Sequence, residues 1–132
     1  MPARETHTFG NFMEEAWGFA EGVKVGDTVY VSGQTGYDEN FQIAVGDMEA
    51  QMRQAYATIA KVLEGLGASL ADVVDETLFV TDVNAAATHG LAVRTEAYGG
   101  KPRVASTLVE VNALGSPDMM IEIKCQARVG SA

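Results

Sequence analysis

The sequence predicts a two-layer α/β sandwich in which two helices pack on one face of a mixed β-sheet. Residues 22–32 have the pattern of a β-hairpin, residues 47–66 carry apolar side chains at helical spacing, and residues 119–129 alternate between apolar and polar. With the segments between them, these patterns give the element order β-β-β-α-β-α-β-β. At 132 residues the chain has the size of one domain, so we expect a single domain over residues 1–132.

Three strands are expected before the first helix. In residues 22–32, Gly26 and Asp27 separate two apolar-rich runs, and a two-residue Gly-Asp loop suits the tight turn of a hairpin. In residues 41–45 an apolar side chain stands at every second position, which predicts the third strand.

Two segments have the pattern of amphipathic helices. In residues 47–66 an apolar stripe recurs at spacings of three and four, with Asp47 as the expected N-cap and Gly67 as a left-handed stop. The stripe consists of Met48, Met52, Ala55, Ile59, Val62 or Leu63, and Leu66. Residues 84–98 form the second expected helix, capped by Asn84, although Gly90 lowers its helix propensity.

The remaining strands are expected at residues 73–80, 104–111 and 119–129. Several predicted strands are apolar on both sides, namely Val29–Val31, Leu78–Val80 and Leu108–Val109. Strands of this kind are usually covered on both faces of the sheet, whereas two helices cover only one. We therefore expect a homo-oligomer in which the bare sheet faces pack together.

Composition argues against several functional classes. The net charge of −9 disfavours binding to nucleic-acid phosphates. A single cysteine excludes an internal disulfide, and neither the cysteine and histidine spacing nor the glycine pattern fits a zinc site or a phosphate-binding loop. No apolar run approaches the roughly 20 residues that cross a bilayer, and the N-terminus has no signal-peptide core. We expect a soluble cytoplasmic protein without metal or cofactor.

Three candidate nucleophiles or bases have simpler structural interpretations. Cys125 lies on the apolar face of the last predicted strand, where a buried structural thiol is favoured over a nucleophile. His89 is placed near the exposed side of the second helix, and His7 lies in the N-terminal segment. Both are better explained as solvated side chains than as general bases.

Two positions are more informative. Ser32 and Gly33 stand where a predicted strand ends, so a ligand could approach the backbone closely there, although a simple bulge or turn explains the glycine equally. Glu122 lies on the polar face of the last strand. If another subunit covers that face, its carboxylate could hold a water for hydrolysis, and otherwise it faces solvent.

At these residues the chain resembles the RidA family, also called YjgF. The matching segments are Val23–Gln34 (VKVGDTVYVSGQ), Gln51–Ala55 (QMRQA), Leu63–Gly67 (LEGLG), Thr77–Asn84 (TLFVTDVN), Val109–Val111 with Leu114, and Ile121–Ile123 (IEI). The resemblance implies the chorismate-mutase-like α/β fold, a homotrimer whose sheets form a central barrel, and clefts between subunits. Typical members hydrolyse reactive enamines and imines, such as 2-aminoacrylate, to a carbonyl compound and ammonia without a cofactor.

The resemblance also implies site residues. Gly33 matches a glycine whose amide lines the pocket, and Glu122 matches the glutamate that orients water. The family's pocket tyrosine corresponds to Phe19, and we assign Ser32 and the nearby Trp17 to the substrate-binding residues as well.

Three polar positions of the family pattern depart, and the first is Phe19, which keeps the ring of the tyrosine and loses its hydroxyl. The family's carboxylate-binding arginine falls at Ser106, and an asparagine of the second helix falls at or next to Gly90. Arg103 could replace the arginine if an irregular strand start returns its side chain to the pocket; otherwise it is a surface or interface charge.

We therefore expect a RidA-like hydrolase that deaminates small enamines or imines, with substrate choice altered by the loss of the arginine. The alternative is a trimeric protein of the same fold that binds a small metabolite without turning it over.

Overall fold

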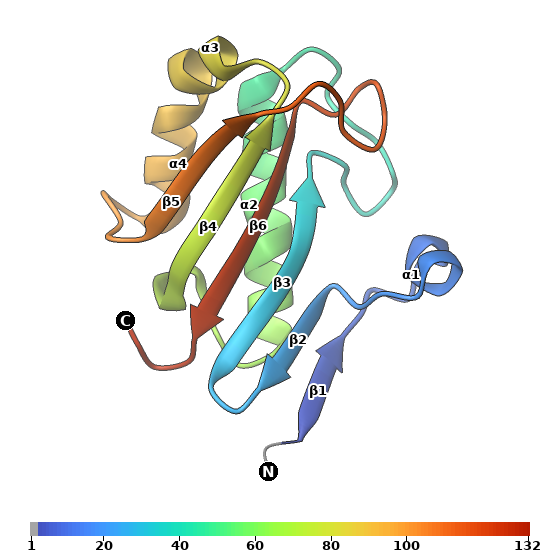
Figure 1. The fold of residues 1–132 in the computed structure, drawn as a ribbon, viewed down its shortest axis with the longest axis vertical. Coiled ribbons are helices and arrows are strands. Elements are labelled where there is room, and N and C mark those ends of the chain that lie inside the picture. The colour runs from blue at the N-terminus through green and yellow to red at the C-terminus, as the bar shows by residue number, and fades with distance from the viewer. Residues whose placement is uncertain (1–2) are drawn as a thin grey trace.

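The computed structural model describes residues 3–132, which build one six-stranded sheet with helices on one face (Figure 1). The spatial order of the strands is β1-β2-β3-β6-β4-β5. Along the chain the elements are β1 (Arg4–His7), α1 (Phe12–Trp17), β2 (Gly22–Val25), β3 (Thr28–Thr35), α2 (Met48–Gly65), η1 (Leu70–Asp72), β4 (Val73–Val80), α3 (Val83–Ala85), η2 (Ala86–Gly90), α4 (Leu91–Tyr98), β5 (Ala105–Glu110) and β6 (Ile121–Arg128). None of the helices in this part of the chain is long and apolar enough to cross a membrane.

The sheet is mixed, as the sequence predicts. Only β4 and β5 run parallel, while β6 lies antiparallel between β3 and β4. Helix α2 packs across β3 and β6 and contacts α4, so the helices form one layer against one sheet face (Figure 1). No helix of residues 3–132 covers the opposite face, where Tyr30 is 43% exposed. The expected packing of bare sheet faces between subunits stays a prediction.

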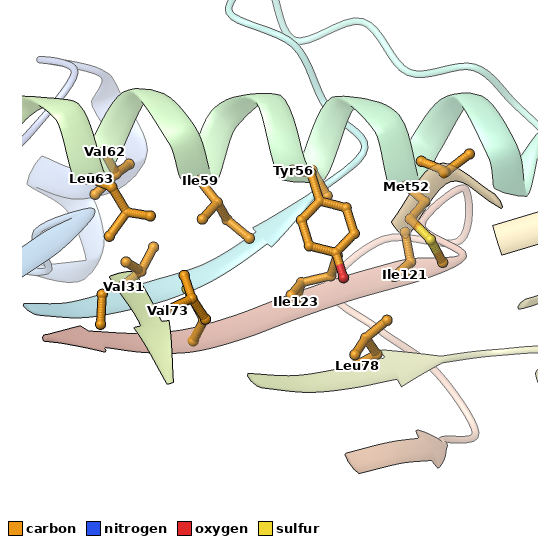
Figure 2. Close-up of a cluster of buried hydrophobic side chains, with 14 of the residues drawn as sticks. Val31, Met52, Tyr56, Ile59, Val62, Leu63, Val73, Leu78, Ile121 and Ile123 are labelled. Atoms are coloured by element: carbon orange, nitrogen blue, oxygen red, sulfur yellow. The ribbon is translucent and has the colours of Figure 1, made fainter. Parts of the chain in front are cut away.

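The core lies between α2 and the sheet, and Figure 2 shows the apolar stripe of α2 facing the strands. The stripe and its partners include Val31, Met52, Tyr56, Ile59, Val62, Leu63, Val73, Leu78, Ile121 and Ile123. Asp47 caps the helix by accepting a hydrogen bond from the Ala50 amide, and Gly67 is left-handed, both as predicted. Cys125 also lies in the core, where burial raises the pKa of its thiol to about 12.

The predicted strand at residues 41–45 is wrong. These residues form a loop, because the Asp38 carboxylate accepts hydrogen bonds from the Asn40 and Gln42 amides and holds a turn. The first strand of the sheet is instead β1, whose sequence RETH contains no apolar residue and therefore carries no strand pattern. Apart from the additional helix α1, the predicted element order β-β-β-α-β-α-β-β along the chain still holds, because β1 supplies the third strand before α2.

The two helical segments outside α2 also differ from expectation. Helix α1 was not expected; a capping box between Asn11 and Glu14 starts it. The second predicted helix begins one residue earlier, because Asp82 rather than Asn84 supplies the N-cap to the Ala85 amide. It is also divided by the π-helical turn η2, which ends at a glycine and leads into α4. Turns of this kind often occur at functional sites.

Candidate functional site

Glu122 and Gly33 lie side by side on the sheet face that has no helices. Two residues of β3, Ser32 and Gly33, stand opposite the single residue Lys124 of β6, so β3 carries a bulge at this point. A Cβ atom on residue 33 would overlap the carboxylate of Glu122. The absence of a side chain at Gly33 lets the Glu122 carboxylate lie close to the β3 backbone in this arrangement. The bulge and the close approach of Glu122 therefore occur at the same glycine.

The carboxylate of Glu122 has little electrostatic support. It makes no hydrogen bond or ion pair within residues 3–132, and the side chain is half-buried. Burial raises the pKa of Glu122, and the neighbouring Lys124 opposes the shift only partly. A half-buried carboxylate with a raised pKa and free lone pairs can accept a proton from a bound water.

Within residues 3–132, Ser32, Phe19 and Trp17 form no side-chain hydrogen bond with Glu122 and line no cavity together with it. The Ser32 hydroxyl donates a 2.7 Å hydrogen bond to the Ala20 carbonyl, so it fixes the segment after α1. Phe19 is 39% exposed and lines a cavity of about 460 Å³ beside α1, and Trp17 is 76% exposed. Glu122 does not line that cavity.

A buried pair of acidic side chains, absent from the sequence-based expectations, supports this region. Glu14 accepts hydrogen bonds from the Phe9, Gly10 and Asn11 amides. Burial by itself would raise the pKa of Glu14, but a hydrogen bond with the Glu21 side chain and the three amide bonds outweigh burial and lower it. Burial, together with the Glu14 carboxylate, raises the pKa of Glu21, which accepts a 2.9 Å hydrogen bond from Gln34. The pair thus links α1 to the end of β3.

Ser106 belongs to a different cluster on the helix-covered face of the sheet. Its hydroxyl donates a 2.7 Å hydrogen bond to the carboxylate of Glu76, which is fully buried. The Tyr56 hydroxyl, the Tyr98 hydroxyl and Arg94 Nε donate to the same carboxylate at 2.9, 2.7 and 2.6 Å. These five residues are called the Glu76 cluster below.

The Glu76 carboxylate is saturated with donors. Burial by itself would raise its pKa, but the bonds from Ser106, Tyr98, Arg94 and Tyr56 outweigh burial and lower it. Glu76 stands at the inward position of an alternation with Leu78 and Val80, and this signal could have identified it as a buried charge. Its partners come from α2, α4 and β5, and no sequence spacing reveals them.

Ser106 also lines a second cavity of about 320 Å³ beside the Glu76 cluster. Its walls are Met52, Leu78, Ala86, Ala87, Gly90, Leu91, Arg94, Ser106 and Leu108. Because Ser106 faces the helices and Glu122 faces away from them, a single chain does not bring the two together. Arg103 is exposed, precedes β5 and does not line this cavity.

Comparison with known proteins identifies the family. The family model described as Endoribonuclease L-PSP matches residues 11–129. A RutC family protein of Pyrococcus abyssi is 36% identical over 113 residues, covering 83% of this chain and 84% of its own. The chain belongs to the YjgF/RutC family.

Solved structures agree with this assignment. Rv2704 from Mycobacterium tuberculosis, a member of the YjgF/YER057c/UK114 family, is 35% identical with a TM-score of 0.84, covering 96% of this chain and 100% of its own. YyfA of the Rid family from Yersinia pestis shares the fold at 23% identity and a TM-score of 0.82, covering 96% and 100%. For this YjgF-family chain the predicted fold and family are therefore confirmed.

Proposed function

We propose that this protein is a RidA-like hydrolase that converts small reactive imines, and the enamines in equilibrium with them, to a carbonyl compound and ammonia. The observation that carries the proposal is the half-buried carboxylate of Glu122, which lies against Gly33 at a strand bulge and is bonded to no cation of residues 3–132. Family membership supports the same reaction class but leaves the substrate open.

In the proposed reaction Glu122 acts as general base and then as general acid. It takes a proton from water while the water oxygen bonds to the imine carbon, and it gives that proton to the imine nitrogen as the C=N π bond breaks, which yields a neutral amino alcohol. Glu122 then takes the hydroxyl proton and passes it to the amino nitrogen, the C–N bond breaks, ammonia leaves, and the C–O bond becomes a carbonyl. Imine and water thus give carbonyl and ammonia with no change in oxidation state, so the reaction calls for neither a metal nor an organic cofactor.

The proposal includes a homotrimer with its reaction clefts between subunits. Glu122 lies on the bare face of the sheet and Ser106 on the helix-covered face near the edge strand β5, so a neighbouring copy would have to bring the two groups together. The exposed aromatic residues Tyr30, Phe19 and Trp17 lie outside the helix-covered core and suit such a contact. We place the trimer in the cytoplasm, with a small metabolite as its partner.

Two other functions are outcomes of the test. A protein that binds a metabolite without turnover would share the fold and the cleft. The family model's description names an endoribonuclease, but the net charge of −9 disfavours approach to an RNA backbone.

The test is ammonia release from imines that an amino-acid oxidase generates in the presence of this protein. We expect wild type to accelerate release and Glu122→Gln to lower the rate to background, because an amide cannot take a proton from water. Glu64→Gln, the same change at an exposed position of α2, is the matched control and should retain the wild-type rate. Turnover that survives Glu122→Gln would remove Glu122 from the reaction, and no turnover in wild type would favour the binding-protein alternative.

A further inference from the structure

Helix α1 is attached to the rest of the chain by a polar contact rather than by apolar packing. Its large apolar side chains are exposed, and the ring on which Phe12 packs, Phe41, is exposed as well. Glu14 is the only buried residue of the helix, and no residue between 3 and 21 belongs to the hydrophobic core. Figure 1 shows α1 set apart from the helices that cover the sheet. Since apolar burial is the dominant stabilising term in folding, α1 depends on the contacts of Glu14 for its position.

The Glu14 carboxylate is held in its charged form. It accepts hydrogen bonds from the Phe9, Gly10 and Asn11 amides at 2.8, 2.9 and 3.0 Å, and the residue is only 6% exposed. Bonds from three N–H groups stabilise a carboxylate and disfavour its protonation. A second acid must therefore carry the proton if the two are to bond to each other.

Glu21 is that second acid, and the fold gives it little room to move away. Its N–H donates to the His7 carbonyl at 2.9 Å, and its carbonyl accepts from the Ser32 amide at 2.8 Å. Its side chain, also 6% exposed, bonds to Glu14 and accepts a 2.9 Å hydrogen bond from Gln34. Ionised carboxylates are acceptors only, so a bond between the two acids requires one proton on the pair.

No cation within residues 3–132 replaces that proton, because neither acid takes part in an ion pair there. The His7 ring packs against Gly65 and the Lys24 ammonium lies beside Gly67, both at the C-terminal end of α2. The other titratable or charged side chains of α1 and of strands β1 to β3 are exposed, namely Arg4, Glu5, Glu15 and Tyr30. If both acids were ionised, like charges would face each other inside the protein, where they repel strongly.

We propose that one proton shared between Glu14 and Glu21 acts as a latch, which holds α1 against the sheet and releases it when the proton is lost. Release frees residues 9–19 while the core under α2 stays intact, because none of these residues belongs to it. The cavity of about 460 Å³ is lined by the same segment, so release disrupts that cavity. The latch lies apart from Glu122 and stands whether or not Glu122 catalyses hydrolysis.

The direction of the pH dependence follows from the two pKa values. Burial and the Glu14 side chain raise the pKa of Glu21, so the latched state is favoured at low pH and weakens as pH rises from about 4.3 through the latched value. Burial would raise the pKa of Glu14, but its hydrogen bonds outweigh burial and lower it, so its contribution is lost only on stronger acidification. Between the released and latched pKa values of Glu21, the ratio of released to latched protein should rise about tenfold for each pH unit.

The test is ¹⁵N relaxation of the whole chain between about pH 4 and 8, together with fluorescence anisotropy of Trp17, the single tryptophan. As pH rises, the heteronuclear NOE of residues 9–19 and the anisotropy should fall, while the NOE of α2 and β6 stays constant. Glu21→Gln should keep the low-pH values throughout, because its amide donates to Glu14 without a titratable proton. Glu15→Gln, the same change at an exposed position of α1, is the control and should follow the wild-type transition.

Three results would overturn the proposal. The first is a wild-type protein in which the NOE of residues 9–19 and the anisotropy do not change with pH. The second is a Glu21→Gln variant that keeps the wild-type transition. The third is a loss of order in α2 and β6 that accompanies the loss in α1, since the whole domain would then respond to pH.

A second variant keeps the test decisive if Glu21→Gln does not fold. Glu14→Gln removes the like charge, and its amide can donate to an ionised Glu21, so the order of α1 should no longer fall as pH rises. A wild-type transition in Glu14→Gln would contradict the latch. Glu122→Gln leaves both acids in place and should keep the wild-type transition even where hydrolysis is lost, which separates the latch from the proposed reaction.

Discussion

The two faces of the sheet each carry a glutamate, and the two glutamates are held in opposite ways. On the helix-covered face, Glu76 is fully buried but accepts four hydrogen bonds, and its pKa is lowered. On the bare face, Glu122 is only half-buried but lacks such donors, and burial raises its pKa. Depth of burial therefore does not decide the role of a buried acid; the supply of donors does.

This comparison assigns the two acids different tasks. A saturated carboxylate can organise its neighbours but cannot accept another proton or ligand without losing a bond, so Glu76 orients Arg94 and Ser106. A carboxylate without partners costs stability and remains available for chemistry.

The largest expected effect is on stability. Glu76→Ala should destabilise the fold by about 3–5 kcal/mol, because it leaves the mostly buried Arg94 and the buried Tyr56 hydroxyl without their acceptor. Glu122→Ala should not destabilise the fold, since it breaks no bond and removes a half-buried charge. Urea unfolding of both variants measures the contrast. Equal losses of stability in the two variants would contradict the different roles assigned to Glu76 and Glu122.

A smaller effect is expected at the bulge. Gly33→Ala should destabilise the fold by up to about 1 kcal/mol, because the new methyl group displaces the Glu122 carboxylate, which ends a flexible, half-buried side chain. Adding Glu122→Ala removes the overlapping group, so the double variant should recover much of the loss. A double-mutant cycle from urea midpoints gives the coupling between the two positions. Additive effects would mean that Gly33 is needed for the bulge geometry alone.

The pH dependence of stability should have opposite signs at the two acids. The folded pKa of Glu76 is lowered, so its contribution is present above the ordinary glutamate value of about 4.3 and is lost as pH falls through the folded value. The folded pKa of Glu122 is raised, so the folded state holds that proton more tightly and stability falls as pH rises from about 4.3 through the folded value.

Urea unfolding of wild type and Glu122→Gln between about pH 4 and 7 measures how the contribution of Glu122 to stability changes with pH. The variant should gain stability relative to wild type as pH rises across this range. A constant difference between the two proteins would show that Glu122 has an ordinary pKa.

The smallest effect is expected at the surface of α2. Arg53 pairs with Glu49 at 3.2 Å and with Glu96 at 3.5 Å, but all three side chains are largely exposed. Water screens such pairs, so Arg53→Ala should leave the unfolding midpoint within experimental error. A shift comparable to that of Glu76→Ala would mean that the Arg94–Glu76 pair does not owe its larger contribution to stability to burial.

The elements with strong side-chain patterns could be predicted from the sequence. The hairpin, α2 and β6 follow from turn residues and periodicity, and each lies against the core. Strand β1 could not be found, because an edge strand of polar residues pairs through its backbone and leaves no side-chain pattern. The alternation at residues 41–45 was misleading, because local hydrogen bonds to Asp38 override it.

Some residues of the candidate site could also be predicted from the sequence, and others could not. The bulge glycine and Glu122 were predicted together through the family resemblance, and the structure places them in contact. The Glu76 cluster was missed because its members come from four elements, and only the fold brings them together. Arg103, the sequence-based candidate for the missing arginine, precedes β5 and does not line the cavity, whereas Arg94 of α4 does.

The central claim is that the sheet holds one saturated and one unpartnered carboxylate, and a ¹³C NMR titration of the glutamate side chains tests it most directly. Glu122 should titrate above the ordinary value of about 4.3, and Glu76 should titrate below it. Assignment by Glu122→Gln identifies the first signal without disturbing the Glu76 cluster. A Glu122 carboxyl that titrates at or below the ordinary value, or a Glu76 carboxyl above it, would contradict the account.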